Sequence, residues 1–174
     1  KIWKAHVYSR MSDYWGPIIY TQFGNAQTSV AYDSQPDVYA DFFKILDEAE
    51  AVLAQSAGGT ATFAGHDLIY EGDVDQWRKY ANSLRLRLAM RISYVEPDLA
   101  RQIAEDAYAA GVIESNADNA EIAVSENSSN GYARITDWGE FPMAAAMESA
   151  LEGYQEPGLE VYFDPAVTDG EYHG

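Results

Sequence analysis

Cysteine is absent from the 174 residues of this chain. The residues therefore offer no disulfide, no thiol nucleophile and no zinc–thiolate site. Basic residues are scarce as well, because 11 Lys and Arg stand against 28 Asp and Glu and give a formal net charge of −17. So acidic a protein is repelled by nucleic acid and by anionic membrane surfaces, and we expect neither as a partner.

A long hydrophobic run is also missing. The longest uncharged stretch, Tyr14 to Tyr32, is interrupted by Gly16, Pro17 and Gly24, and it cannot form a membrane-spanning helix. The chain shows no signal-peptide pattern.

The sequence contains none of the common catalytic and nucleotide-binding motifs. A glycine-rich phosphate loop, a serine nucleophile elbow and a zinc-binding H-E-x-x-H are all absent. His6, His66 and His173 lie far apart with no carboxylate at ligand spacing, which indicates structural or exposed roles. We therefore expect no metal, no cofactor and no enzyme activity.

A group of three acidic residues lies around the start of a predicted helix. Glu71, Asp73 and Asp75 are the densest carboxylates outside the predicted helices. Asp73 is positioned to cap a helix, and Asp75 lies in its first turn, where the helix dipole favours an acid. Because sequence spacing does not reveal the geometry of a paired-carboxylate site, a glycan hydrolase remains an alternative.

The most informative stretch is Gly72 to Ile92. The alternation of apolar residues and Arg in Leu84 to Ile92 is typical of a strand, but no Gly or Pro interrupts the chain from Val74 to Glu96. That length exceeds an ordinary strand, and the wider spacing is helical, so we predict a helix. The residues that share its main apolar face are Trp77, Ala81, Leu84, Leu88, Ile92 and Val95.

Leu86 and Met90 fall on the opposite side of this helix. A helix that is apolar on two sides is covered on both, so we expect it to be the central helix of a helical stack. Arg87 and Arg91 flank the main face, and we expect each of them to extend to solvent, with pairing to a carboxylate as the alternative.

Further helices are predicted from apolar spacing and from Pro and Gly punctuation. Their expected ranges are 1–13, 37–55, 97–110 and 142–151. Between them, 112–141 is a long polar excursion, with a short strand expected at 121–125. Loops of this length in compact domains are usually functional or disordered.

Several stretches resemble the SusD/RagB family of outer-membrane nutrient-binding lipoproteins, and in particular its SusD-like branch. The resemblance is carried by Trp77 to Arg91 (WRKYANSLRLRLAMR), by Tyr32-Asp33-Ser34-Gln35 and by the turn Tyr14 to Tyr20, in which Ile19 stands at the family's usual proline. A fourth stretch has Glu156-Pro157-Gly158-Leu159 where the family has Asp-Pro-Arg-Leu, so the Arg is absent.

The resemblance implies an all-α fold of tetratricopeptide-like stacked helix pairs with long loops, of which 1–174 is one partial domain from the middle of a longer protein. It also implies a surface-exposed lipoprotein of the Bacteroidetes outer membrane, with its lipid anchor outside this chain. Such a protein captures a nutrient, most often an oligosaccharide, for a SusC-like TonB-dependent transporter. A helical-repeat module that binds protein or peptide is the main alternative.

A sugar site combines a flat aromatic platform with hydrogen-bonding groups. The candidates are Asn130, Tyr132 and Trp138 in the polar excursion and Trp15, with Tyr20, in the first loop. For Trp15 we favour a buried anchor of the turn over a sugar platform. For Tyr132 and Trp138 the structural and the ligand-binding interpretations both stay open.

Overall fold

The computed structural model describes residues 1–59, 61, 64–125, 127–136, 138, 142–166 and 170–172. Contacts divide the chain into two compact units, Lys1–Ile122 and Ala123–Gly174. That 1–174 belongs to one domain, with 112–141 as a loop excursion within it, stays a prediction.

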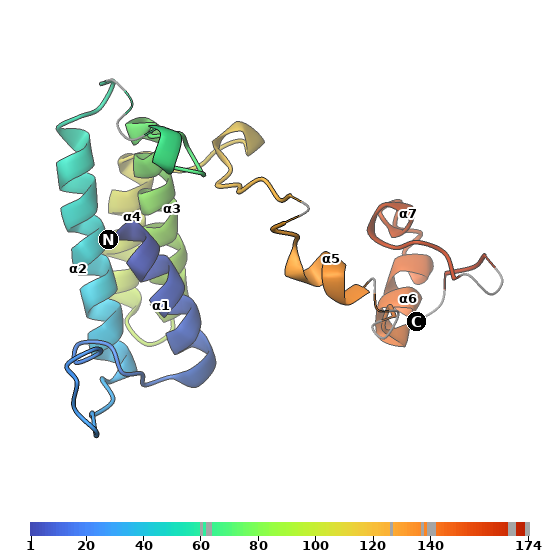
Figure 1. Ribbon diagram of the computed structural model, residues 1–174, viewed down its shortest axis with the longest axis horizontal. Coiled ribbons are helices and arrows are strands. Elements are labelled where there is room, and N and C mark those ends of the chain that lie inside the picture. The colour runs from blue at the N-terminus through green and yellow to red at the C-terminus, as the bar shows by residue number, and fades with distance from the viewer. Residues whose placement is uncertain are drawn as a thin grey trace. The chain divides into compact units, whose positions relative to one another are not determined.

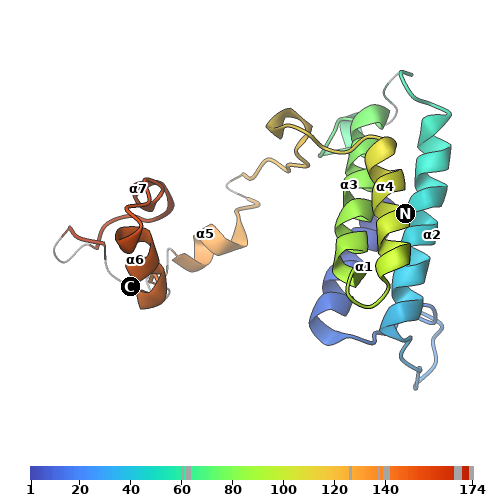
Figure 2. The same ribbon diagram turned by 180° about the vertical axis from the view of Figure 1, so that it is seen from behind.

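The first unit is a stack of antiparallel helices. Its elements are α1 (Ile2–Trp15), α2 (Gln35–Ala54), η1 (Ala64–His66), α3 (Val74–Ile92), α4 (Pro97–Ala109) and η2 (Asn116–Asp118). Consecutive helices run in opposite directions (Figures 1 and 2), and α3 packs against both α2 and α4. The four predicted helices of this unit and the all-α fold of stacked helix pairs are confirmed.

The core of the first unit forms where α2 meets α3. The side chains of Phe42, Leu46 and Leu88 are almost completely buried there. Full burial of an aliphatic or aromatic side chain contributes roughly 1.5–3 kcal/mol. These contacts therefore stabilise the pairing of α2 with α3, on which the other two helices pack.

The central position of α3 is confirmed, but its second covered side differs from the prediction. Asn82 and Ala89 are buried on that side, whereas Met90 is 61% exposed. The small side chain of Ala89 allows α4 to approach closely, and Asn82 donates hydrogen bonds to carbonyls at the end of α4. Leu86 is half-buried, as expected of a covered side, whereas the assignment of Met90 to that side is wrong.

The second unit contains short helices: α5 (Gly131–Thr136), α6 (Ala145–Gly153) and α7 (Leu159–Tyr162). The helix predicted at 142–151 corresponds to α6. The strand expected at 121–125 is wrong, because 121–124 form no regular structure and Ser125 makes an isolated bridge to Ser128. Among the described residues of this unit, Met143 is the buried one.

None of the helices in the described part of the chain is both long enough and apolar enough to cross a membrane.

Candidate functional site

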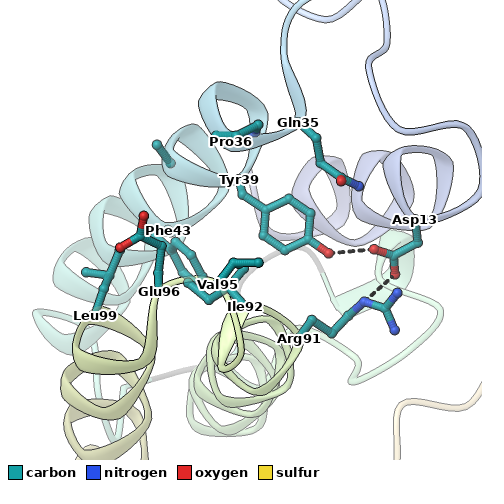
Figure 3. A pocket seen from close by; sticks show the side chains of 11 residues that line it. Asp13, Gln35, Pro36, Tyr39, Phe43, Arg91, Ile92, Val95, Glu96 and Leu99 are labelled. Carbon is teal, nitrogen blue, oxygen red and sulfur yellow. Dashed lines mark hydrogen bonds and ion pairs between the residues drawn. The ribbon is translucent and has the colours of Figure 1, made fainter.

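A cavity of about 620 Å³ opens among the helices of the first unit. Its lining comes from the end of α1, the start of α2, the end of α3 and the start of α4 (Figure 3). The lining residues are Asp13, Gln35, Pro36, Tyr39, Ala40, Phe43, Arg91, Ile92, Val95, Glu96 and Leu99. The wall is thus largely apolar, with charged groups at its edge.

A network of three side chains closes one end of this cavity. The Tyr39 hydroxyl donates to Asp13 Oδ1 at 2.5 Å, and Arg91 Nε lies 3.0 Å from Asp13 Oδ2 (Figure 3). Burial and the hydrogen bond to Asp13 raise the pKa of Tyr39 to about 12, although Arg91 opposes the shift. The network joins α1, α2 and α3, and Arg91 is held by a carboxylate, so the expectation that it simply extends to solvent is wrong.

The polar groups of this cavity mostly bond to each other. Asp13 is occupied by Tyr39 and Arg91, and Gln35 Nε2 donates to the Ser12 carbonyl at 2.8 Å. A small-molecule site needs polar groups that converge on the ligand. The geometry therefore favours a junction between helices over a sugar site.

Trp15 ends α1 beside the first loop. Its side chain is 69% exposed, so the interpretation of Trp15 as a buried anchor is wrong. Gly16, at φ 71°, reverses the chain directly after it, and the Gly16 amide donates to the Ser12 carbonyl at 2.8 Å. The turn leaves the indole available for stacking. Tyr20, by contrast, is buried, and its hydroxyl donates to Asp41.

The other predicted platform residues lie in the second unit. Tyr132, at 83%, and Trp138, at 62%, are both strongly exposed. Asn130 directly precedes α5, where its Oδ1 accepts from the Tyr132 amide at 2.9 Å and its carbonyl accepts from the Arg134 amide at 3.1 Å. Asn130 therefore has a local capping role, and ligand binding by Asn130, Tyr132, Trp138 and Trp15 stays a prediction.

The acidic group before α3 has structural partners. Asp73 caps α3, since its Oδ1 accepts from the Gln76 amide at 3.0 Å. Asp75 accepts from the Gly58 amide at 3.1 Å and lies 3.7 Å from Arg78. These contacts explain two of the three carboxylates without any catalytic role. Among the described residues, no group of three or more His, Asp or Glu side chains is arranged to hold a metal ion.

His6 is structural, as predicted. Its ring stacks on Trp3, and its Nδ1 lies 2.7 Å from the Tyr80 hydroxyl of α3. Burial, together with the charges of Arg87 and Arg10, lowers the pKa of His6. His66 is exposed in η1, and His173 lies outside the described residues.

Polar residues of α3 that the apolar pattern did not single out hold several other segments. Asn82 Nδ2 donates to the carbonyls of Ala110 and Gly111, at 3.4 and 3.1 Å. Ser83 Oγ accepts from the Ile113 amide at 2.8 Å. These bonds hold the chain where it leaves α4.

Ion pairs extend the same pattern toward α2 and η2. Arg78 pairs with Glu50 through two bonds of 2.8 and 3.0 Å, and Arg85 Nη2 lies 2.6 Å from Asp47. Lys79 Nζ lies 2.8 Å from Asp118 in η2. The partners of these α3 residues are 28 to 39 residues away in the chain and lie on other elements, so spacing in the sequence does not reveal the pairs.

One aspartate organises the loop before α2. Asp33 accepts from the amides of Tyr20 and Thr21, both at 2.9 Å, and from Thr21 Oγ1 at 2.6 Å. Hydrogen bonds, first among them that from the Thr21 hydroxyl, lower the pKa of Asp33. This explains Asp33 in the Tyr32-Asp33-Ser34-Gln35 stretch, whose Ser34 caps α2.

These features define the class of protein. It is an all-α scaffold of stacked helices, in which one central helix bonds to the segments around it. A family model described as "SusD-like: Susd and RagB outer membrane lipoprotein" matches residues 1–174. The chain belongs to this SusD-like family.

Solved structures support the assignment. A chitin-binding SusD homolog from Flavobacterium johnsoniae is 44% identical with a TM-score of 0.89, and the match covers 95% of this chain and 36% of that one. A SusD homolog from Bacteroides uniformis is 37% identical with a TM-score of 0.86, over 98% of this chain and 37% of the other. A protein described only as chitin-binding is 34% identical with a TM-score of 0.80, over 99% and 39%.

The chain thus spans about a third of the length of these solved relatives. No curated protein matches it.

Proposed function

We propose that the full-length protein is a non-catalytic lipoprotein of the outer-membrane surface that binds an oligosaccharide and delivers it to a SusC-like TonB-dependent transporter. The observation that carries this proposal is the family match over residues 1–174, because that family is described as outer-membrane lipoproteins. The first unit fits the role of a rigid scaffold for binding loops, since the polar residues described above bond to neighbouring helices.

The ligand class we propose is chitin, the polymer of N-acetylglucosamine. Two of the relatives reported above are described as chitin-binding, at 44% and 34% identity. A sugar of this kind offers a flat apolar ring face for stacking and an acetamido group for hydrogen bonds. The exposed rings of Trp15, Tyr132 and Trp138 are suited to the stacking part of such recognition.

The test is calorimetric titration of the full-length protein with N-acetylglucosamine oligosaccharides. Glucose oligosaccharides of the same length and linkage, which lack the acetamido group, are the matched control. We expect binding of the first and much weaker binding of the second. Binding of peptides with no binding of any glycan would instead support the peptide-binding alternative.

A hydrolase is tested in the same samples by assaying new reducing ends. We expect none, and we expect binding to survive substitution of Glu71 by Gln. Release of reducing ends that this substitution abolishes would contradict the proposal of a non-catalytic protein.

Variants address the proposed platform. Tyr132→Ala and Trp138→Ala are each expected to weaken glycan binding roughly tenfold, or by about 1.4 kcal/mol, as for a stacking residue at the centre of an interface. Tyr94→Ala is the matched control, since Tyr94 is an even more exposed aromatic residue on the turn after α3. Unchanged affinity in both platform variants would remove these residues from the site and leave the family-level proposal standing.

A further inference from the structure

The α1 helix has two unlike faces, and the larger side chains lie on the outer one. Its buried residues are Ile2, Ala5, Ser9 and Ser12, most of which are small. Its outer face carries Trp3, Val7 and Met11, which are 46%, 41% and 38% exposed, followed by Tyr14. We call Trp3, Val7, Met11 and Tyr14 the outer stripe of α1.

The spacing of the outer stripe fits another helix. Residues three or four apart fall on one side of a helix, and such a ridge packs into the groove of a neighbouring helix. The stripe is flanked by cations: Lys4 lies over the Tyr20 ring, 4.0 Å from its centroid, and Arg10 lies over the Tyr14 ring at 5.7 Å. Its complement is a helix with an apolar stripe bordered by acidic residues.

The stripe is also held firmly in place. Small residues on the inner face let α1 pack closely on α2. The Lys1–Glu48 ion pair, the Tyr80–His6 hydrogen bond and the bonds from Tyr39 and Arg91 to Asp13 fix both ends of α1. A rigid apolar ridge of this kind is a preformed packing surface.

The solved relatives are long enough to supply a further element that covers the stripe. The match to the Flavobacterium johnsoniae homolog superimposes 95% of this chain on 36% of that one, so the same scaffold exists inside a much longer polypeptide. Within the first unit, helices pack against their neighbours in sequence, and α2 already occupies the inner face of α1. The sequence neighbour on the other side of α1 is the element most directly placed to reach the outer face.

We propose that, in the full-length protein, the outer stripe of α1 is covered by a helix of the same polypeptide that precedes Lys1. This helix presents an apolar stripe toward Trp3, Val7 and Met11, with acidic residues near Lys4 and Arg10. The proposal concerns the packing of the protein itself and does not depend on the ligand that the protein binds.

Photo-crosslinking of the full-length protein tests this contact. Val7 is replaced by benzoylphenylalanine, the protein is irradiated, and cross-linked peptides are mapped by mass spectrometry. We expect a cross-link within one chain, from position 7 to a peptide that precedes Lys1. A cross-link to a second copy, to the transporter or to a peptide after Gly174 would overturn the proposal, as would the absence of any cross-link.

A stability measurement gives an independent check. Met11→Glu places a charge under the covering helix and is expected to lower the melting temperature of the full-length protein clearly. Met90→Glu is the matched control, because Met90 is an exposed methionine of α3 that lies outside the stripe. Equal melting temperatures for the two variants would overturn the proposal, and the cross-linking result still decides if Met11→Glu does not fold.

Discussion

The single carboxylate of Asp67 organises the chain as it enters α3. Its Oδ2 accepts from Trp77 Nε1 at 2.6 Å and from the Gly72 amide at 2.9 Å, while its Oδ1 accepts from the Ile69 amide at 3.1 Å. Burial opposes ionisation of Asp67, but these hydrogen bonds outweigh it and lower its pKa. One residue thus fixes the backbone before α3 and the orientation of the indole ring of Trp77.

We predict that Asp67→Asn lowers the free energy of unfolding by about 1–3 kcal/mol, since an amide offers one acceptor oxygen and leaves donors unpaired. Because the folded pKa lies below the unfolded one, the contribution is present above about pH 4 and is lost as the pH falls through the folded pKa. Urea unfolding at neutral and acidic pH measures both effects. Glu105→Gln, an exposed change of the same charge on α4, is the control, and an equal loss of stability there would refute this role.

Tyr39 supplies the opposite pH dependence. Its pKa is raised to about 12, above the value near 10 of an unperturbed tyrosine. The stabilisation from its bond to Asp13 is therefore complete below about pH 10 and is lost as the pH rises toward 12. We predict that Tyr39→Phe costs about 1 kcal/mol at neutral pH, and that its unfolding free energy falls less than that of the parent between about pH 9 and 11. Parallel slopes for the two proteins would contradict the prediction.

Neither Asp67 nor Tyr39 could be identified from the sequence. Local patterns did predict Asp73 as a cap, because a capping side chain and the backbone amide that donates to it lie three residues apart. Asp13, Tyr39 and Arg91 come from three helices and meet only when those helices pack. The exposure of Trp15 was missed for a related reason, since a turn sequence does not reveal what covers it.

At the scale of elements, the role of α3 goes beyond its apolar face. Its polar side chains reach α1, α2, the end of α4 and η2 through His6, Glu50, Gly111 and Asp118. The α3 side chains that make these contacts are Arg78, Lys79, Tyr80 and Asn82. All four lie in the WRKYANSLRLRLAMR stretch, so the family resemblance has a physical content. Many of its polar positions specify the position of a neighbouring segment.

We predict that Asn82→Ala lowers the free energy of unfolding by about 1–3 kcal/mol, because the buried amide caps the end of α4 and its removal leaves carbonyls unpaired. Asn119→Ala, on an exposed amide outside the helices, is expected to change it by less than about 0.5 kcal/mol. Chemical denaturation of both variants measures the difference. Similar values for the two would show that the amide of Asn82 has no special weight.

The longer helices could be predicted from the sequence because thirteen to twenty residues repeat the apolar spacing several times. The 6-residue α5 and the 4-residue α7 were missed, since so few residues cannot show a period. The prediction of a strand at 121–125 was wrong because a short alternation of apolar and polar residues forms a strand only beside a partner strand. Among the described residues, this segment makes only the isolated Ser125–Ser128 bridge. Element length therefore decided which parts of the fold were predictable.

At the scale of the whole molecule, the two units differ in how much they bury. Phe42, Leu46 and Leu88 are enclosed in the first unit, whereas α6 and α7 bury none of their residues. Local stability follows buried apolar contact, and amide exchange reports it directly. A helix without a buried side depends on other parts of the protein for its stability.

We therefore predict slow amide hydrogen exchange in α2 and α3 of the 174-residue chain and fast exchange in α6 and α7. In the full-length protein, exchange in α6 and α7 should slow, because relatives about three times as long carry further residues that can cover these helices. Exchange followed by peptide mass spectrometry compares the two proteins segment by segment. Equally fast exchange of α6 in both would contradict the prediction that further residues cover it. Equally slow exchange in both would mean that the second unit is stable by itself, and that the proposed platform residues Tyr132 and Trp138 do not depend on the rest of the polypeptide for their positions.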